Sequence, residues 1–175
     1  MTQPTCEERI DEHFKNTMED IRFFVVLLDA NSLDELDKDQ IKKLSDMGHD
    51  PEDFDFDDKY QLIDEYGLAF DFTTQQQGKD IAPHFVEMVD EWDYGYKEAA
   101  QESNEAIARW ELSWGGPSDG FLIEYNYNGR FWEIENIIYY FHDWFDGAGK
   151  TLFSQDFDDV ERVVEALVDF SCMVM

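Results

Sequence analysis

The sequence contains few basic residues. Only 13 Lys and Arg stand against 42 Asp and Glu, which gives a formal net charge of −29 and a pI near 4.1. The excess is spread evenly, because residues 1–75 hold 21 acids and 7 bases and residues 76–175 hold 21 and 6. Such a body repels nucleic acid and anionic membrane and attracts cationic surfaces over about 8 to 10 Å at ordinary salt. We therefore expect a basic protein partner and no direct binding to nucleic acid or membrane.

The sequence also has only two cysteines and no long apolar run, and its first residues do not fit the pattern of a signal peptide. Cys6 and Cys172 lie far apart in the sequence. The N-terminal residues are acidic and polar, whereas a signal peptide has a cationic stretch followed by an apolar one. No run approaches the roughly 18 apolar residues that a membrane helix needs. We expect a cytoplasmic protein with two reduced thiols.

Motifs for catalysis and metal binding are incomplete. Residues 147–151 resemble the end of a phosphate-binding loop, but Trp144 stands where that pattern requires glycine. The acids of 53–58 fit three ligand positions of a calcium hand, whereas Asp58 replaces its turn glycine and Asp64 its bidentate glutamate. The four histidines have no zinc-ligand spacing. We expect no enzyme, no cofactor and no dedicated metal site.

Aromatic residues are concentrated in residues 110–145, which hold 12 of the 28 and therefore predict a packed sheet. Asn128-Gly129 lies between two alternating runs, a signal typical of a two-residue hairpin turn. With a first strand at 110–114, the stretch predicts three antiparallel strands. The register that this turn implies pairs Tyr127 with Arg130, Tyr125 with Trp132, Ile123 with Ile134 and Phe121 with Asn136.

Apolar residues at steps of three and four predict helices around this sheet. Thr5 and Glu8 have the form of a capping box at the start of the first helix. Residues 68–72 fit either a short strand or an extended link. The predicted helices cover 5–28, 33–47, 83–110 and a C-terminal segment around 160–168.

The predicted fold class is α+β, with helices packed on a small antiparallel sheet of about three strands, an Asn-Gly hairpin and a C-terminal helix. Residues 73–78, TTQQQG, are typical of a connector. We expect a single domain, 1–175, that comprises a helical subdomain 1–75 and an α+β subdomain 80–175.

The spacing of acids predicts a function. The helix predicted over 83–110 carries seven acids between Glu87 and Glu105, about one per 4 Å of axis at 1.5 Å per residue. One DNA strand carries about one charge per 3.4 Å. Residues 46–71 add ten acids against one Lys, and 156–169 add six against one Arg. This pattern predicts an inhibitor that mimics nucleic acid, occupies the Lys and Arg groove of a basic nucleic-acid-binding protein or nuclease complex, and does no chemistry.

Other interpretations account for parts of this pattern. Any single acidic run is compatible with a solvated helix face, and salt-adapted proteins are similarly acidic, although 16% aromatic content argues against salt adaptation. The alternative function is an immunity or antitoxin protein that caps a cationic nuclease toxin, which would concentrate acids and exposed aromatics in one patch. The sequence leaves open whether the protein forms a homodimer. The candidate partner-binding residues are Asp53, Asp55, Asp57, Asp58, Glu87, Asp90, Glu91, Glu98, Glu102, Glu105, Asp143, Trp144 and Asp146.

One stretch of the chain resembles a pattern in other proteins. Leu-Ser-Trp-Gly-Gly-Pro at 112–117, then a hairpin and His-Asp-Trp-Phe at 142–145, resembles a Leu-Ser-x-Gly-Gly-Pro and Asp-Trp pattern in small uncharacterised plasmid and phage proteins. It covers about 35 of the 175 residues, and Trp114 departs from the small residue expected there. The remainder is similar in composition to DNA-mimicking antirestriction and anti-CRISPR proteins. The resemblance implies a mobile-element origin and an inhibitor of host defence in the host cytoplasm.

Overall fold

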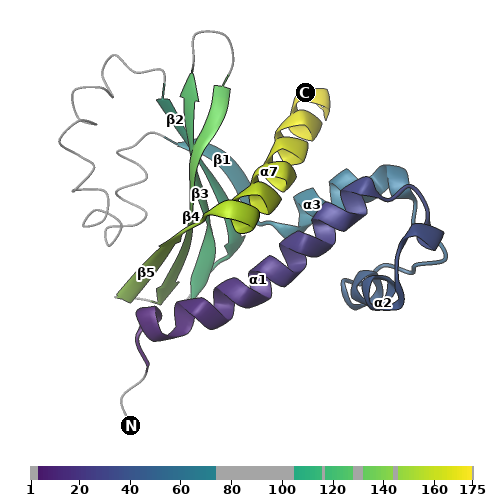
Figure 1. Ribbon diagram of the computed structural model, residues 1–175, viewed down its shortest axis with the longest axis horizontal. Helices are drawn as coiled ribbons and strands as arrows, with labels where there is room; N and C mark the ends of the chain where they lie inside the picture. Colours follow the sequence, from purple (N-terminus) through teal and green to yellow (C-terminus); the bar gives the residue numbers. More distant parts are fainter. Residues whose placement is uncertain (1–3, 74–104, 116, 128–131, 144–145, 175) are drawn as a thin grey trace. The chain divides into compact units, whose positions relative to one another are not determined.

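The computed structural model describes residues 4–73, 105–115, 117–127, 132–143 and 146–174, which form helices and one antiparallel sheet (Figure 1). The predicted α+β class is confirmed, but the sheet has five strands rather than about three. The helices are α1 (Cys6–Asp29), α2 (Lys38–Asp46), α3 (Lys59–Tyr66) and α7 (Ser154–Val174), with short 3-10 turns η1 (Leu33–Glu35) and η2 (Phe56–Asp58). The strands are β1 (Ala69–Thr73), β2 (Glu105–Ser113), β3 (Ser118–Tyr127), β4 (Trp132–Asp143) and β5 (Asp146–Thr151).

The strands lie in the sheet in chain order, β1-β2-β3-β4-β5, and every neighbouring pair is antiparallel. Of the two alternatives for residues 68–72, a short strand or an extended link, the strand is observed, because β1 pairs with β2 at one edge of the sheet. β5, at the other edge, has the sequence DGAGKT, in which two glycines and an alanine leave little side-chain pattern. An edge strand of this composition is held mainly by its backbone ladder.

The hairpin register predicted from Asn128-Gly129 is wrong. Four residues, 128–131, separate the paired ends of β3 and β4 and lie outside the described residues. Glu124 pairs with Asn136 and Tyr125 with Ile134, so Glu135 is the extra residue of a β-bulge. The observed pairs are Tyr127 with Trp132, Tyr125 with Ile134, Ile123 with Ile137 and Phe121 with Tyr139.

The bulge explains why the observed register is favoured. It reverses the side-chain alternation of β4, so that Ile137 and Tyr139 lie opposite Ile123 and Phe121. All four of these side chains are fully buried. The predicted register would instead have placed the polar Asn136 opposite Phe121, at a cost in buried apolar contact.

Two predicted helices are corrected at their ends. The helix predicted over 83–110 lies outside the described residues as far as 104, but from Glu105 onward the chain is strand β2. Apolar residues at 106–110 satisfy both a helical and a strand period, and pairing with β1 and β3 selects the strand. The helix predicted over 33–47 is divided into η1 and α2, because Asp37 caps α2 in a reciprocal capping box with Gln40.

The chain forms two compact units, each with a core of its own. The sheet unit is Met1–Phe14 with Gly67–Phe153, and the helical unit is Lys15–Tyr66 with Ser154–Met175. Helix α1 therefore contributes residues to both. The subdomain boundary predicted between 75 and 80 lies outside the described residues.

The core of the sheet unit is aromatic. Trp110 stacks on Phe121 with ring centroids 5.7 Å apart, and Phe121 lies 5.4 Å from Tyr139. Phe14 of α1 packs 5.3 Å from Tyr139, which places the first turns of α1 on this face of the sheet. Each fully buried aromatic contributes roughly 1.5 to 3 kcal/mol of transfer free energy. The capping box of Thr5 and Glu8 is confirmed, with both reciprocal hydrogen bonds present.

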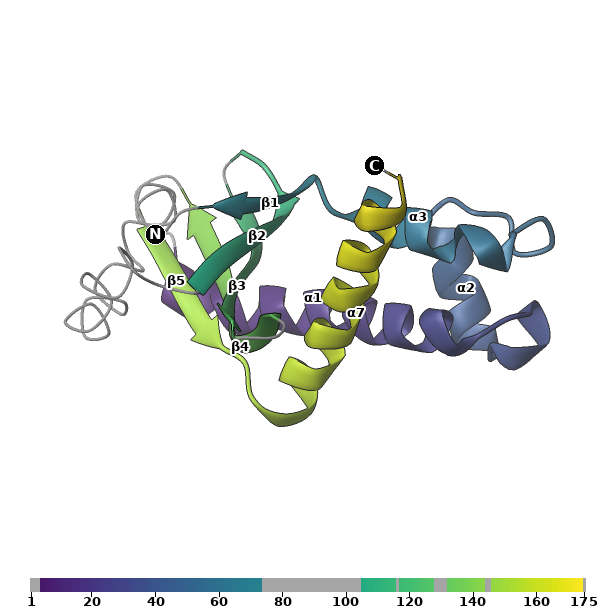
Figure 2. The same cartoon turned by 90° about the horizontal axis from the view of Figure 1, so that it is seen from above.

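The core of the helical unit is mainly aliphatic. α2 and α3 lie beside the C-terminal half of α1 in both views (Figure 1, Figure 2). α3 also contacts α7, whose predicted apolar stripe is confirmed by the burial of Val160, Val163, Val164 and Leu167. Among the described residues, no helix has the length and apolar character to cross a membrane. The other buried residues of this core include Met18, Ile21, Phe24, Leu27, Leu44, Leu62 and Ile63.

Candidate partner-binding surface

Nearly all basic side chains of the described residues are engaged within the molecule. Ten Lys and Arg are described, and eight of them form ion pairs with carboxylates. Of the other two, Lys59 is buried and Lys38 is exposed without an ion pair. The paired residues are Arg9, Lys15, Arg22, Lys42, Lys43, Arg109, Lys150 and Arg162.

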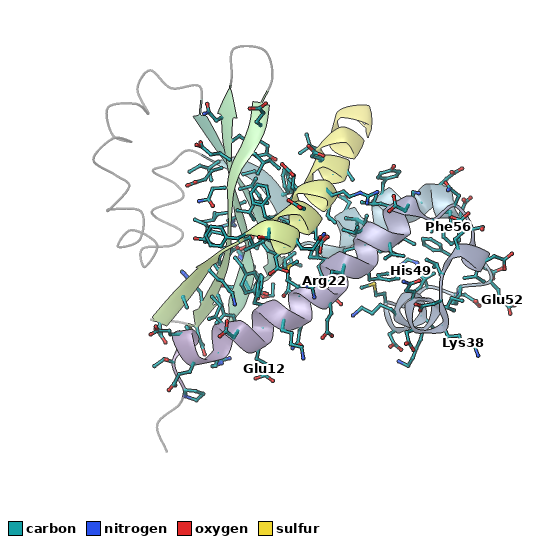
Figure 3. The ribbon with its side chains drawn as sticks, viewed as in Figure 1. Glu12, Arg22, Lys38, His49, Glu52 and Phe56 are labelled. Atoms are coloured by element: carbon teal, nitrogen blue, oxygen red, sulfur yellow. The ribbon has the colours of Figure 1, made fainter. Side chains whose placement is uncertain are left out.

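Residues 50–65, which we call the acidic run, carry the densest exposed charge of the helical unit. The run comprises the loop after α2, the η2 turn and most of α3. Its eight carboxylates are all on exposed residues, and none forms an ion pair with a described Lys or Arg. Glu52 lies at its outer side (Figure 3). The eight are Asp50, Glu52, Asp53, Asp55, Asp57, Asp58, Asp64 and Glu65.

Lys59 is the single base of the acidic run, and it does not neutralise the run. The residue is 7% exposed, and its Nζ donates hydrogen bonds to the backbone oxygens of Leu28 (2.8 Å) and Ala30 (2.9 Å). These carbonyls lie at the C-terminal end of α1, where a cation is favoured by the helix dipole. The positive charge is therefore used to end α1, and the surface of the run stays negative.

Two aspartates of the acidic run fix its backbone. A side-chain oxygen of Asp50 accepts from the Glu52 N–H at 3.1 Å, and one of Asp55 accepts from the Asp57 N–H at 3.0 Å. Aspartates stabilise turns in this way. The carboxylates of Asp53, Asp57 and Asp58 accept no hydrogen bond from described residues. Of the four predicted contacts in this segment, Asp55 thus has a structural role, and the other three are free to meet a partner.

Aromatic rings alternate with these carboxylates and pack on one another. His49 packs edge-on against Phe54 with centroids 5.7 Å apart, and Phe54 packs against Phe56 at 5.2 Å. The alternation of Asp and Phe in residues 53–57 is explained by this arrangement, since the rings are half-buried and the carboxylates exposed. An open cavity of about 200 Å³ here is lined by His49, Asp50, Asp53, Phe54, Asp55, Asp58, Gln61, Leu62 and Glu65.

The cavity lining combines five carboxylates with the rings of His49 and Phe54, an environment that attracts organic cations such as the side chains of Lys and Arg. Within the described segments, no three His, Cys, Asp or Glu side chains are placed to hold a metal ion. The arrangement thus suits recognition of a cationic surface.

Comparison with known proteins adds no further assignment. No protein family, curated protein or solved structure matches the chain. The assignment of the candidate surface therefore rests on the geometry and charge of its own residues.

The predicted contacts Asp143 and Asp146, where β4 ends and β5 begins, have structural partners. Asp143 forms an ion pair with Arg9 at 2.5 Å. The Asp146 carboxylate accepts from the Cys6 backbone N–H at 2.6 Å, and the Cys6 thiol donates to the Asp146 carbonyl at 3.2 Å. Burial, and then the nearby Asp146 carboxylate, raise the pKa of the Cys6 thiol. Asp143 and Asp146 thus join the start of α1 to the β4–β5 end of the sheet.

The remaining predicted contacts fall largely outside the described residues. Glu105 is the first residue of β2. Three acids that are not among the predicted contacts are buried. Glu111 pairs with Arg109 at 2.7 Å, Glu124 accepts from Asn136, and Asp159 accepts from Gln155. The predicted contacts outside the described residues are Glu87, Asp90, Glu91, Glu98, Glu102 and Trp144.

Sequence reasoning also missed several exposed residues. Asp50, Glu52, Asp64 and Glu65 extend the predicted run at both ends. All four belong to the ten acids counted in residues 46–71, which hold a single Lys, but they were not predicted as contacts. Trp114 was assigned to a strand, but the residue follows the end of β2 and is 80% exposed.

Proposed function

We propose that this protein is an acidic mimic of nucleic acid that binds and inhibits a basic nucleic-acid-binding protein or nuclease complex of host defence, of the anti-CRISPR or antirestriction type. It acts by binding alone, in the cytoplasm of the host cell. The observation that supports this most is the separation of charges: nine of the ten described Lys and Arg are engaged within the fold, while the eight carboxylates of the acidic run face solvent.

The charge distribution supports mimicry of an extended polyanion. The helical unit holds 22 acids and 7 bases, a net charge of −15, and the sheet unit holds 20 and 6, a net of −14. The total of −29 equals the charge of about 14 to 15 base pairs, at two phosphates per pair. Both units thus contribute to the field that draws a cationic groove toward the molecule.

The acidic run is suited to make the contact itself. Asp50 and Asp55 hold its turns, and the half-buried rings of Phe54 and Phe56 pack against each other within it. A pre-organised loop loses little conformational entropy on binding. The attraction between its carboxylates and a partner's Lys and Arg therefore contributes almost fully to the binding free energy. The protein would then displace nucleic acid by competing for the same cations.

The test begins with capture of partners from a host lysate at low salt, followed by competition with duplex DNA. We expect the captured protein to bind DNA, to be released by DNA, and to lose affinity steeply as salt is added. Binding unchanged at 1 M salt, where the Debye length is about 3 Å, would contradict the proposal.

Two matched variants then distinguish the acidic run from the general field. The first replaces Asp53, Asp57 and Asp58 by Asn. The control replaces three exposed glutamates of the sheet unit by Gln, namely Glu12, Glu133 and Glu135, and changes the net charge equally. At about 0.5 to 1 kcal/mol per lost charge pair, the first variant should weaken binding about tenfold or more and the control much less. Equal effects would mean that the run is not the contact.

One observation also favours the alternative function. The acidic run concentrates its carboxylates over aromatic rings in one segment, as expected of an immunity or antitoxin protein that caps a cationic nuclease toxin. The two functions differ in the partner. A toxin partner would kill cells when expressed alone, and co-expression of this chain would rescue them, whereas a defence complex would not be toxic by itself.

A further inference from the structure

Trp114 is unusual among the described aromatic residues because it lies almost entirely in solvent. It follows β2 in the turn to β3 and is 80% exposed, whereas Trp110, four residues earlier, is 1% exposed. A tryptophan carries roughly 150 to 250 Å² of mostly apolar surface. Single exposed aliphatic residues are common, but tryptophan is the residue type most enriched at the energetic centres of interfaces.

The strand ends on either side of Trp114 are fixed to the core of the sheet unit. The Asp119 N–H donates to Ser113 Oγ at 3.0 Å, and the Ser113 hydroxyl in turn contacts the Asp119 carboxylate. The hydroxyl of the fully buried Tyr139 donates to the same carboxylate at 2.6 Å. Gly115 adopts a positive φ of 120°, a conformation that other residues rarely adopt. Trp114 thus follows directly on a strand end that these hydrogen bonds hold, which lowers the entropic cost of using its side chain as a contact.

The charges of the sheet unit indicate what kind of partner this side chain meets. Its three described bases are all paired: Arg9 with Asp143, Arg109 with Glu111 and Lys150 with Asp11. The charged residues that this described part of the unit leaves exposed are acids, among them Glu7, Glu8, Glu12, Glu133 and Glu135. A second copy of a chain with a net charge of −29 is repelled. The complementary partner is cationic.

We propose that Trp114 is a stacking platform for an arginine side chain of the basic protein partner, and this inference rests on the proposed function. Arginine suits the site better than lysine, because its planar and weakly hydrated guanidinium stacks on an aromatic face while its charge is attracted by the net negative charge of the molecule. Trp114 then supplies a preference among cationic surfaces that carboxylates alone do not provide.

Octa-arginine and octa-lysine peptides test this at low salt, with affinities measured by isothermal titration calorimetry. The wild type should bind the arginine peptide more tightly than the lysine peptide. Trp114→Ala should weaken arginine-peptide binding about two- to fivefold and remove most of the preference, while Trp114→Phe keeps part of it. Phe153→Ala is the matched control, because Phe153 is also an exposed aromatic of the sheet unit, at 72%.

The outcomes separate this inference from the function on which it rests. If both peptides bind and Trp114→Ala matches the wild type, the stacking role is refuted and the charge mimic stands. If neither peptide binds the wild type at low salt, both fail. Sedimentation of each variant completes the test, since a fall in mass on changing Trp114 alone would assign this side chain to a contact between copies of the chain.

Discussion

Replacing Lys59 by Met tests whether this buried cation is a structural part of the helical unit. Its Nζ donates to two backbone carbonyls at the end of α1, of which the Ala30 oxygen is buried and the Leu28 oxygen is partly buried. Methionine keeps most of the length and apolar surface of the side chain but cannot donate. A buried carbonyl left without a donor costs about 1 to 3 kcal/mol, and water can reach the Leu28 oxygen in part. We expect a loss of about 2 to 4 kcal/mol in the free energy of unfolding.

The assay is urea denaturation followed by far-ultraviolet circular dichroism, together with thermal melting. For a chain of this length the loss should lower Tm by about 4 to 16 °C. Lys38→Met is the matched control, because Lys38 is exposed and forms no ion pair with a described residue, and its replacement makes the same change in net charge. The control should stay within about 0.5 kcal/mol of the wild type. If the two variants lose equal stability, the effect is general charge repulsion and the reasoning about Lys59 is refuted.

Two further predictions concern stability. A Cβ at position 120 would lie 2.2 Å from the Trp110 carbonyl oxygen, so Gly120→Ala should destabilise by about 1 to 3 kcal/mol in urea denaturation; an unchanged midpoint would contradict the close packing of β2 against β3. Burial, and then Glu165 and Asp158, raise the pKa of Glu161. Its ionisation therefore opposes folding at pH 7, and Glu161→Gln should raise the urea midpoint at pH 7 but not near pH 3, where the carboxyl is protonated in both states. The same gain at both pH values would refute the assignment.

The sequence predicted the elements whose patterns are local. The capping box of Thr5 and Glu8, the apolar stripe of α7 and the strands of the central hairpin follow from periodicities that side chains impose on one element at a time. β5 escaped prediction because DGAGKT has almost no side-chain alternation, and its partner is the backbone of β4. The hairpin register escaped because the bulge at Glu135 depends on which residues fill the core, a property of the packed sheet.

The candidate surface was predictable in part for a similar reason. The density of Asp in 53–58 is visible in the sequence, and the structure leaves these residues exposed. Asp143 and Asp146 looked equivalent to them, but the partners of these two carboxylates, Arg9 and Cys6, are more than 130 residues away along the chain. The residues next to a carboxylate in the sequence do not reveal that it will bind a distant residue of the same chain. The inward direction of Lys59 is also a tertiary property.

The division of the helical unit between two chain segments has a consequence for synthesis. Residues 15–66 leave the ribosome first, and α7, which supplies Val160, Val163, Val164 and Leu167 to the same core, follows only after the 87 residues from 67 to 153. At roughly 5 to 20 residues per second, α7 is synthesised about 4 to 17 seconds after the first segment. During that interval its apolar residues are incompletely covered, and its 16 acids against 6 bases keep nascent copies apart by mutual repulsion. The charge that we assign to partner binding would thus also protect the unfinished chain from aggregation.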